Sequence, residues 1–257
     1  MCSEWIQTFC HVRDSVEKHR WILIAGAVWF TVCACWAVND QNKMFEFYGF
    51  SASAIDYIIA QQGAIYSGLT IFPFTLLFVI KCKQNSLDIQ YILRYQSREK
   101  MLRKQFVESL IYAIGTATVL VGVMTVIGWI ISGKLINWNA TDSVYFGQTG
   151  EAIQANFLVV AAVIWMMYIM KFVLIFAITD ISMWCPKTLF LVWIILIIPL
   201  GIETFHYGRV YFGLFAIWQN SWLSVGKWSR VILGGILFWS LEYLVGKKII
   251  ERRDIWG

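Results

Sequence analysis

Long, almost uncharged apolar runs restrict the possible fold of this chain more than any other feature. Several runs approach the roughly 20 residues that a helix needs to cross a hydrocarbon layer about 30 Å thick. Of all residues, 59% are hydrophobic and only 14% are charged, whereas soluble domains carry about 25% charged residues. Because lipid offers the backbone no hydrogen-bond partner, the spans are predicted to be helices. We expect one all-α membrane domain over the whole chain, with six spans near 21–38, 64–81, 106–132, 157–180, 187–203 and 228–246.

The basic residues are distributed as this six-span arrangement requires. One set of loops and ends carries fifteen Lys or Arg residues, and these segments are 1–20, 81–104, 179–188 and 246–257. The other set carries five, in 39–63, 133–155 and 204–230. Cytoplasmic loops concentrate Lys and Arg, so both termini and the 81–104 loop are predicted to be cytoplasmic. This asymmetry accounts for the net charge of +5, and no nucleic-acid partner is expected.

Three shorter segments are predicted to lie at the membrane surface or to enter it partway. Residues 1–20 place apolar side chains at helical spacing, which indicates an interfacial helix, with a frayed polar tail as the alternative. Residues 39–63 are predicted to form a short amphipathic helix at the outer surface. Residues 206–222 contain a nine-residue apolar patch, about half a span. This patch predicts a re-entrant element entering from the outside, with an interfacial aromatic belt as the alternative.

The cytoplasmic segment 84–104 carries an ordered pattern. Ile89, Ile92 and Leu93 make an apolar stripe at helical spacing, while Asp88 and Arg94 project elsewhere. Ser97 is a suitable cap for a second helix, which continues through Arg98 into the third predicted span. Positive-inside anchoring alone would explain the charge but not this pattern. The segment is therefore predicted to be a short amphipathic helix, a break and a basic helical stalk.

Lys171, Glu108 and Glu242 are three of the charged residues that fall inside predicted spans. Lys171 lies deep in the fourth span, where a lysine costs roughly 2.5–3.5 kcal/mol on insertion scales. Glu108 and Glu242 lie in the third and sixth spans, toward the same side. We expect Lys171 to be paired or hydrated inside the protein, and the alternative is that its stem reaches back to the headgroups.

The order of these elements resembles the type 2 ABC-exporter permeases, also called type V exporters. The resemblance covers nearly the whole chain: a surface helix, six spans, a coupling helix between the second and third spans, a re-entrant element and a short basic tail, GKKIIERRDIWG. The local segment QYILRYQSREKMLRKQF is similar to one in small permeases for peptide export or bacteriocin immunity in Gram-positive bacteria.

The resemblance implies a function and a set of partners. Such permeases pair with a second copy or a homologue, and each docks a separate ATPase subunit that binds ATP and Mg²⁺. It implies a multi-pass protein of a bacterial plasma membrane that exports amphipathic peptides or other hydrophobic substrates. The ATPase-coupling residues would be Asp88, Ile89, Ile92, Leu93, Arg94 and Arg98. The outer gate would comprise Glu203, Tyr211, Phe212, Phe215 and Trp218.

Other classes fit the residues less well. An ATP-independent secondary transporter or channel is the alternative, although internal repeats, which that class often shows, are not visible. A membrane enzyme is disfavoured, because no H-E-x-x-H or G-x-S-x-G motif occurs. GWIISGK, residues 128–134, fits the start of a phosphate-binding loop, but Leu135 replaces the required Ser or Thr. No catalytic residue, no metal site and no cofactor of this chain's own is therefore predicted.

Overall fold

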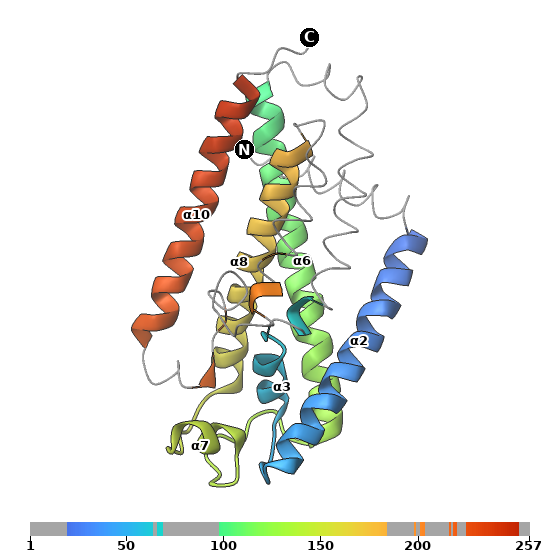
Figure 1. Ribbon diagram of the computed structural model, residues 1–257, viewed down its shortest axis with the longest axis vertical. Helices are drawn as coiled ribbons and strands as arrows, with labels where there is room; N and C mark the ends of the chain where they lie inside the picture. The colour runs from blue at the N-terminus through green and yellow to red at the C-terminus, as the bar shows by residue number, and fades with distance from the viewer. Residues whose placement is uncertain are drawn as a thin grey trace.

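The computed structural model describes residues 20–63, 66–68, 98–183, 198, 201–203, 216, 218–219 and 225–251. Over these residues the chain forms six named helices and no strand, which confirms the all-α prediction. Figure 1 shows three long helices, α6, α8 and α10, running side by side, with α2 diverging from α6 toward its own first residue. The predicted interfacial helix at 1–20 lies outside the described residues, apart from Arg20, where α2 begins.

Helix α6 (Arg98–Ser132), helix α8 (Phe157–Met183) and helix α10 (Val225–Glu251) match three of the predicted spans. Each is long and apolar enough to cross a membrane. The start of α6 lies at the same end of the bundle as the ends of α8 and α10, which we call the Arg98 end (Figure 1). Apolar side chains remain exposed on all three helices, most of all on α10: Leu233, Ile236, Leu237, Phe238, Leu241, Leu244 and Val245. Lipid is the environment in which such a surface is stable.

Helix α2 (Arg20–Phe47) contains the predicted span 21–38 and continues nine residues beyond it. Its buried side chains, Phe30, Ala34, Val38 and Gln41, recur every three or four residues and face the rest of the bundle. Among the described residues, the helices long and apolar enough to cross a membrane are three, and α2 is not one of them. The predicted spans at 64–81 and 187–203 lie largely outside the described residues, so the count of six stays a prediction.

Helix α3 (Ala54–Ala60) differs from the expectation of an amphipathic helix at the outer surface. All of its residues from Ala54 to Ile59 are buried, between α2, α6 and α8. Residues 39–63 were expected outside because that set of loops carries few Lys and Arg residues. The structure instead places the polar side chain of Asp56 among hydrogen-bond donors, so this helix can be buried without leaving the carboxylate unsatisfied.

A cap of loops and one short helix covers the end of the bundle opposite Arg98. Helix α7 (Val144–Thr149) lies there, with its N-cap Ser143 accepting from the Phe146 N–H. Three backbone hydrogen bonds join residues 51–55 to residues 134–142: the N–H groups of Ser51, Ala54 and Ile55 donate to the carbonyls of Asp142, Lys134 and Leu135. The ring of Trp138 stacks on Tyr145, with ring centres 4.5 Å apart. We call this assembly the cap, and it comprises residues 48–53 and 133–156.

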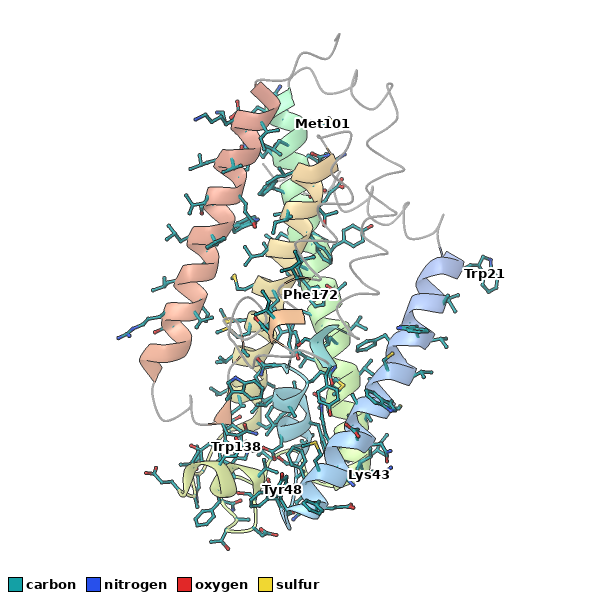
Figure 2. The ribbon with its side chains drawn as sticks, in the orientation of Figure 1. Trp21, Lys43, Tyr48, Met101, Trp138 and Phe172 are labelled. Carbon is teal, nitrogen blue, oxygen red and sulfur yellow. The ribbon has the colours of Figure 1, made fainter. Side chains whose placement is uncertain are left out.

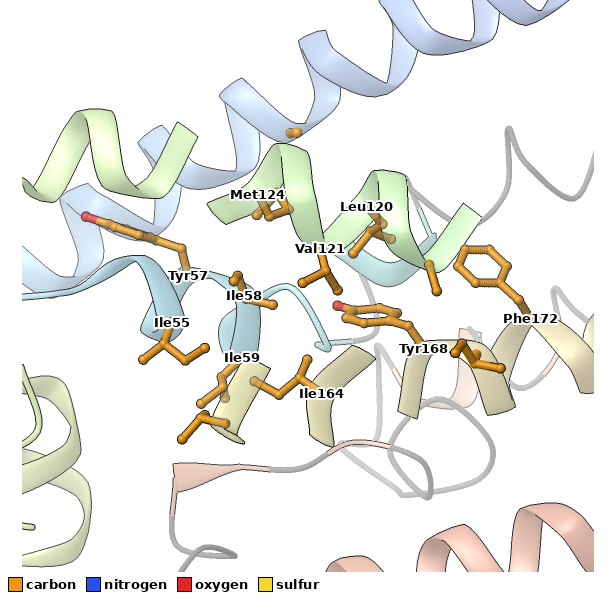
Figure 3. Packing of buried hydrophobic residues seen from close by; sticks show 14 of the residues in the cluster. Ile55, Tyr57, Ile58, Ile59, Leu120, Val121, Met124, Ile164, Tyr168 and Phe172 are labelled. Carbon is orange, nitrogen blue, oxygen red and sulfur yellow. The ribbon is translucent and has the colours of Figure 1, made fainter. Parts of the chain in front are cut away.

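The main core lies between α3, α6 and α8, close to the cap. Figure 3 shows its closest packing, where Ile58 and Ile59 of α3 meet Val121 of α6 and Tyr168 of α8. Gly128 allows α3 to approach α6, because a Cβ there would lie 3.0 Å from the Ala54 Cα. The core therefore holds the short helix α3 firmly against two membrane-spanning helices.

Candidate functional site

The most unusual residue of the bundle is Lys171, at the middle of α8. It lies about 20 Å along the helix from either end, at 1.5 Å per residue. Its side chain is fully buried, and its Nζ sits 5.4 Å from the centre of the Tyr168 ring. Figure 2 shows its helical neighbour Phe172 pointing into the bundle. Lys171 is therefore surrounded by the protein interior, and its predicted pairing or hydration stays a prediction.

Among the described residues, Glu203 acts electrostatically on Lys171. Glu203 belongs to a short helical stretch, residues 201–203, and is itself only 6% exposed. The sequence suggested Glu108 and Glu242 as charges on the same side, and it assigned Glu203 to the outer gate. The structure thus joins a residue of the predicted gate to the buried charge of α8. The opposite charges offset part of the cost of removing each from water.

Glu108 and Glu242 lie nearer the Arg98 end. Glu108 is buried on α6, and its Oε1 is 3.7 Å from Lys104 Nζ, one turn earlier. Beside it, the Ser109 hydroxyl donates to Asp180 Oδ2, a contact that joins α6 to α8. Glu242 of α10 is half-buried, and its Oε2 has no hydrogen-bond partner among the described residues. These groups make the Arg98 end the more polar half of the α6–α8 contact.

The Arg98 end also joins α6 to α10. The Phe106 ring meets the Tyr243 ring edge-on, with centres 5.2 Å apart. Gly246 of α10 lies closest to α8, since a Cβ there would lie 3.1 Å from Ile181 Cγ1, whereas its distance of 3.5 Å to Leu102 Cδ1 of α6 would be an ordinary van der Waals contact. Lys247 completes the contact by pairing with Glu99. The predicted basic stalk is therefore the first part of α6, and it is packed on the last turns of α10.

A second buried carboxylate, Asp56 of α3, lies beside the cap. Its Oδ2 accepts from the Ser53 N–H at 2.9 Å and from the Ser53 hydroxyl at 2.6 Å. Its Oδ1 accepts from Trp138 Nε1 at 2.9 Å and from Gln219 Nε2 at 3.4 Å. Burial raises the pKa of Asp56, and these hydrogen bonds act in the opposite direction. The carboxylate connects three parts of the chain that are far apart in sequence.

The neighbouring Tyr57 extends this network to α2. Its hydroxyl donates to Asn42 Oδ1 at 2.5 Å. Burial, with the charges of Asp56 and Glu46, raises the pKa of Tyr57 to about 12. The phenol therefore remains a donor at any physiological pH. Sequence reasoning missed this network, although Ser53 followed three residues later by Asp56 is a recognisable helix-start pattern.

The remaining predicted site residues are distributed as follows. Trp218 is half-buried and packs against the main core, one residue before Gln219. The other predicted gate aromatics, Tyr211, Phe212 and Phe215, lie outside the described residues, as do the coupling residues Asp88, Ile89, Ile92, Leu93 and Arg94. Arg98 is the first residue of α6. Within the described ranges, no group of three or more His, Cys, Asp or Glu side chains is placed to bind a metal.

Comparison with protein-family models, with characterised proteins and with solved structures finds no match to this chain. The function of the protein is therefore inferred from its residues and their geometry.

Proposed function

We propose that this chain is the membrane-spanning permease subunit of an ATP-driven exporter, with six spans and both ends in the cytoplasm. Two copies, or this chain and a homologue, would enclose a path for amphipathic peptides or other hydrophobic substrates. Separate ATPase subunits would bind ATP and Mg²⁺ and would dock on the segment that precedes α6. The chain itself would carry out no hydrolysis.

The observation that carries this proposal is the continuity of α6. A helix of 35 residues is about 52 Å long, whereas the hydrocarbon layer is about 30 Å thick. The excess begins at Arg98, directly after the predicted coupling segment, and it bears Lys100, Arg103 and Lys104. A continuous helix transmits a displacement along its axis, because its backbone hydrogen bonds resist bending. Motion of a docked partner that reached Arg98 would thus pass along α6 into the membrane without a further break in the helix.

The packing at the Arg98 end supports the same function. The first turns of α6 contact α8 through Ser109 and Asp180, and they contact α10 through Phe106 and Tyr243. A push on Arg98 would therefore act on three spans together. A connection that only anchored the chain to the membrane would need no such contacts.

The test is association with an ATPase subunit. Replacing Ile92 and Leu93 with Asp should abolish co-purification of an ATPase from the native membrane, while the protein still inserts. A matched control places Asp at Leu87 and Tyr91, which fall on the opposite helical face at 100° per residue. That variant should retain the ATPase. If no ATPase co-purifies with the wild-type chain, an ATP-independent transporter becomes the favoured function.

The topology needs its own test. Reporter fusions after residues 97 and 139 and at the C-terminus should report cytoplasm, outside and cytoplasm in that order. A C-terminal reporter that is active outside the cell would exclude the six-span arrangement and the exporter assignment with it.

A further inference from the structure

We propose that Glu242 of α10 is a proton-binding site inside the membrane, where its carboxyl group is held as the neutral acid. The ligand is a single hydrogen ion. Ionisable side chains inside membrane spans characterise the proton relays of pumps and transporters. The proposal rests on contacts among the long helices and not on the exporter function, so it applies equally to an ATP-independent transporter.

Glu242 lies well inside the apolar part of its helix. That part runs from Ser229 to Ile249, and Glu242 comes seven residues, or about 10 Å, before its last residue. Lysine and arginine reach the headgroups from inside a span by means of long apolar stems, which a glutamate lacks. The Oε2 atom of Glu242 is buried within the protein. The carboxyl group is therefore held away from bulk water.

The face of α10 that carries Glu242 is packed against the bundle. Four residues at intervals of four, three and four positions share this side of the helix: Gly235, Trp239, Glu242 and Gly246. A Cβ at Gly235 would lie 3.1 Å from Met170 Sδ of α8, and one at Gly246 would be as close to α8. Glu242 thus lies on the protein-facing side of α10, while the opposite side exposes the apolar residues that lipid covers.

The side chains next to Glu242 on this face supply no hydrogen bond to its buried oxygen. Trp239 and Tyr243 pack against a small apolar cluster, which comprises Leu102, Phe106 and Ala177. The Trp239 Nε1–H is itself buried without an acceptor, so the indole does not donate to the carboxyl group. In the part of the chain that the structure describes, Glu242 Oε2 has no hydrogen-bond partner.

Several charged or titratable groups lie on the helices that pack against α10, and on α10 itself. From the middle of the bundle to Glu99, helix α6 carries Glu99, Lys100, Arg103, Lys104, Glu108 and Tyr112. Helix α8 carries Lys171 and Asp180 over the same half. Tyr243, Lys247 and Lys248 follow Glu242 on α10.

The cations of this set are either exposed or engaged with other carboxylates. Lys104 Nζ lies 3.7 Å from Glu108 Oε1, and Lys247 Nζ lies 2.8 Å from Glu99 Oε1. The charge that acts on Lys171 is that of Glu203. The other three, Lys100, Arg103 and Lys248, are exposed. Over the described ranges, none of these cations forms an ion pair with Glu242.

A carboxyl group in these surroundings holds a proton. An ionised carboxylate without a cation or a donor is far more costly to bury than the neutral acid, and such a group neutralises instead. Lipid on the far side of α10 removes water further. Glu108 provides the contrast, because the positive charge of Lys104 stabilises its ionised form.

Infrared spectroscopy of the full-length protein detects this proton directly, because the C=O stretch of a protonated carboxyl group is separate from those of carboxylates and amides. The protein is placed at pH 7 in nanodiscs of ether-linked lipids, which lack ester carbonyls. We expect loss of one protonated carboxyl group per chain in Glu242→Gln, whose amide has the shape of the neutral acid. Glu108→Gln is the matched control and should retain the whole band.

A second measurement uses the wild-type protein alone. Dicyclohexylcarbodiimide dissolves in lipid, reaches α10 along its exposed apolar side, and reacts with protonated carboxyl groups. The carboxyl proton moves to one nitrogen of the reagent while the carboxyl oxygen bonds to its central carbon. The acyl group then migrates to nitrogen, so the stable N-acylurea forms without a further reactant. Peptide mass spectrometry should find this adduct at Glu242 and not at Glu108.

The possible outcomes separate the proton site from the exporter function. An unchanged band in Glu242→Gln overturns the proton site, as does a band that Glu108→Gln removes instead. Absence of the adduct from Glu242 also overturns it, and this result holds even if a variant fails to fold. A protonated Glu242 in a chain that co-purifies with no ATPase leaves the proton site standing and removes the exporter function.

Discussion

Lys247 Nζ of α10 lies 2.8 Å from Glu99 Oε1 of α6. This ion pair joins residues 148 positions apart and connects the first turn of α6 to the last turns of α10. Both side chains are substantially exposed, so solvent and salt weaken the attraction. The pair fixes how these two helices meet at the Arg98 end more than it stabilises the fold.

Removing that pair should have a small effect on stability. Lys247→Gln is expected to lower the free energy of unfolding by less than about 1 kcal/mol, because exposed pairs contribute 0–1 kcal/mol. Thermal unfolding in detergent micelles at low and high salt provides the measurement. A large loss that persists in high salt would show that Lys247 acts through packing.

A methyl group at Gly128 should separate α3 from α6. The new Cβ of Gly128→Ala would lie 3.0 Å from the Ala54 Cα and 3.1 Å from Tyr57 Cδ2, so backbone must shift. Overpacking of this kind costs about 1–3 kcal/mol. Gly122→Ala, six residues earlier on the same helix, meets nothing within 4 Å and should change stability by less than about 0.5 kcal/mol. Equal melting temperatures for the two variants would contradict the close packing of α3.

Asp56 should make stability depend on pH in a specified direction. Burial raises the pKa of Asp56, so the folded protein holds this proton more tightly than the unfolded chain does. The contribution of Asp56 to the free energy of unfolding is therefore greatest below its ordinary pKa near 3.8, and it falls as the pH rises through the raised pKa. Asp56→Asn cannot ionise, so wild type should lose stability relative to this variant as the pH increases. If the melting temperatures of wild type and Asp56→Asn changed in parallel with pH, the predicted loss of stability through ionisation of Asp56 would be refuted.

Lys171 and Glu203 should depend on each other. Removing one member of a buried charged pair costs about 3–5 kcal/mol, because the other charge is left uncompensated. Lys171→Met alone should be strongly destabilising, and adding Glu203→Gln should restore much of the loss. Adding Glu108→Gln to Lys171→Met should restore no stability, because the described partner of Glu108 is Lys104. A double-mutant cycle of melting temperatures measures the coupling, and strict additivity for Lys171 and Glu203 would disprove it.

The sequence predicted the long helices well because their signal is local. The runs at 106–132, 157–180 and 228–246 appear as α6, α8 and α10; the ends at 132 and 157 coincide, and the other four extend three to eight residues further. Hydrophobic length alone decides such elements. The polar flanks are added because helical hydrogen bonding continues after the apolar pattern ends.

Burial of the short helix α3 could not be predicted in the same way. Its apolar residues, Ile55, Tyr57, Ile58 and Ile59, would suit either an interface or a core. Ser53 supplies two local donors to Asp56 Oδ2, but the donors to Oδ1 come from Trp138 and Gln219, 82 and 163 positions away. The pairing of Lys171 with Glu203 is likewise a property of two distant segments. A single sequence shows which residues are present, but it does not show which distant residues lie close together in the fold.

The neutrality of the Lys171–Glu203 pair has a consequence for the response to membrane voltage. Moving one elementary charge through a potential of 100 mV involves about 2.3 kcal/mol of electrical work. With Lys171 protonated and Glu203 ionised, the two charges sum to zero, so displacing both together requires almost no electrical work. A conformational change that moves the two side chains together should proceed equally well in energised and in depolarised membranes. One that separates them would make the protein a voltage sensor.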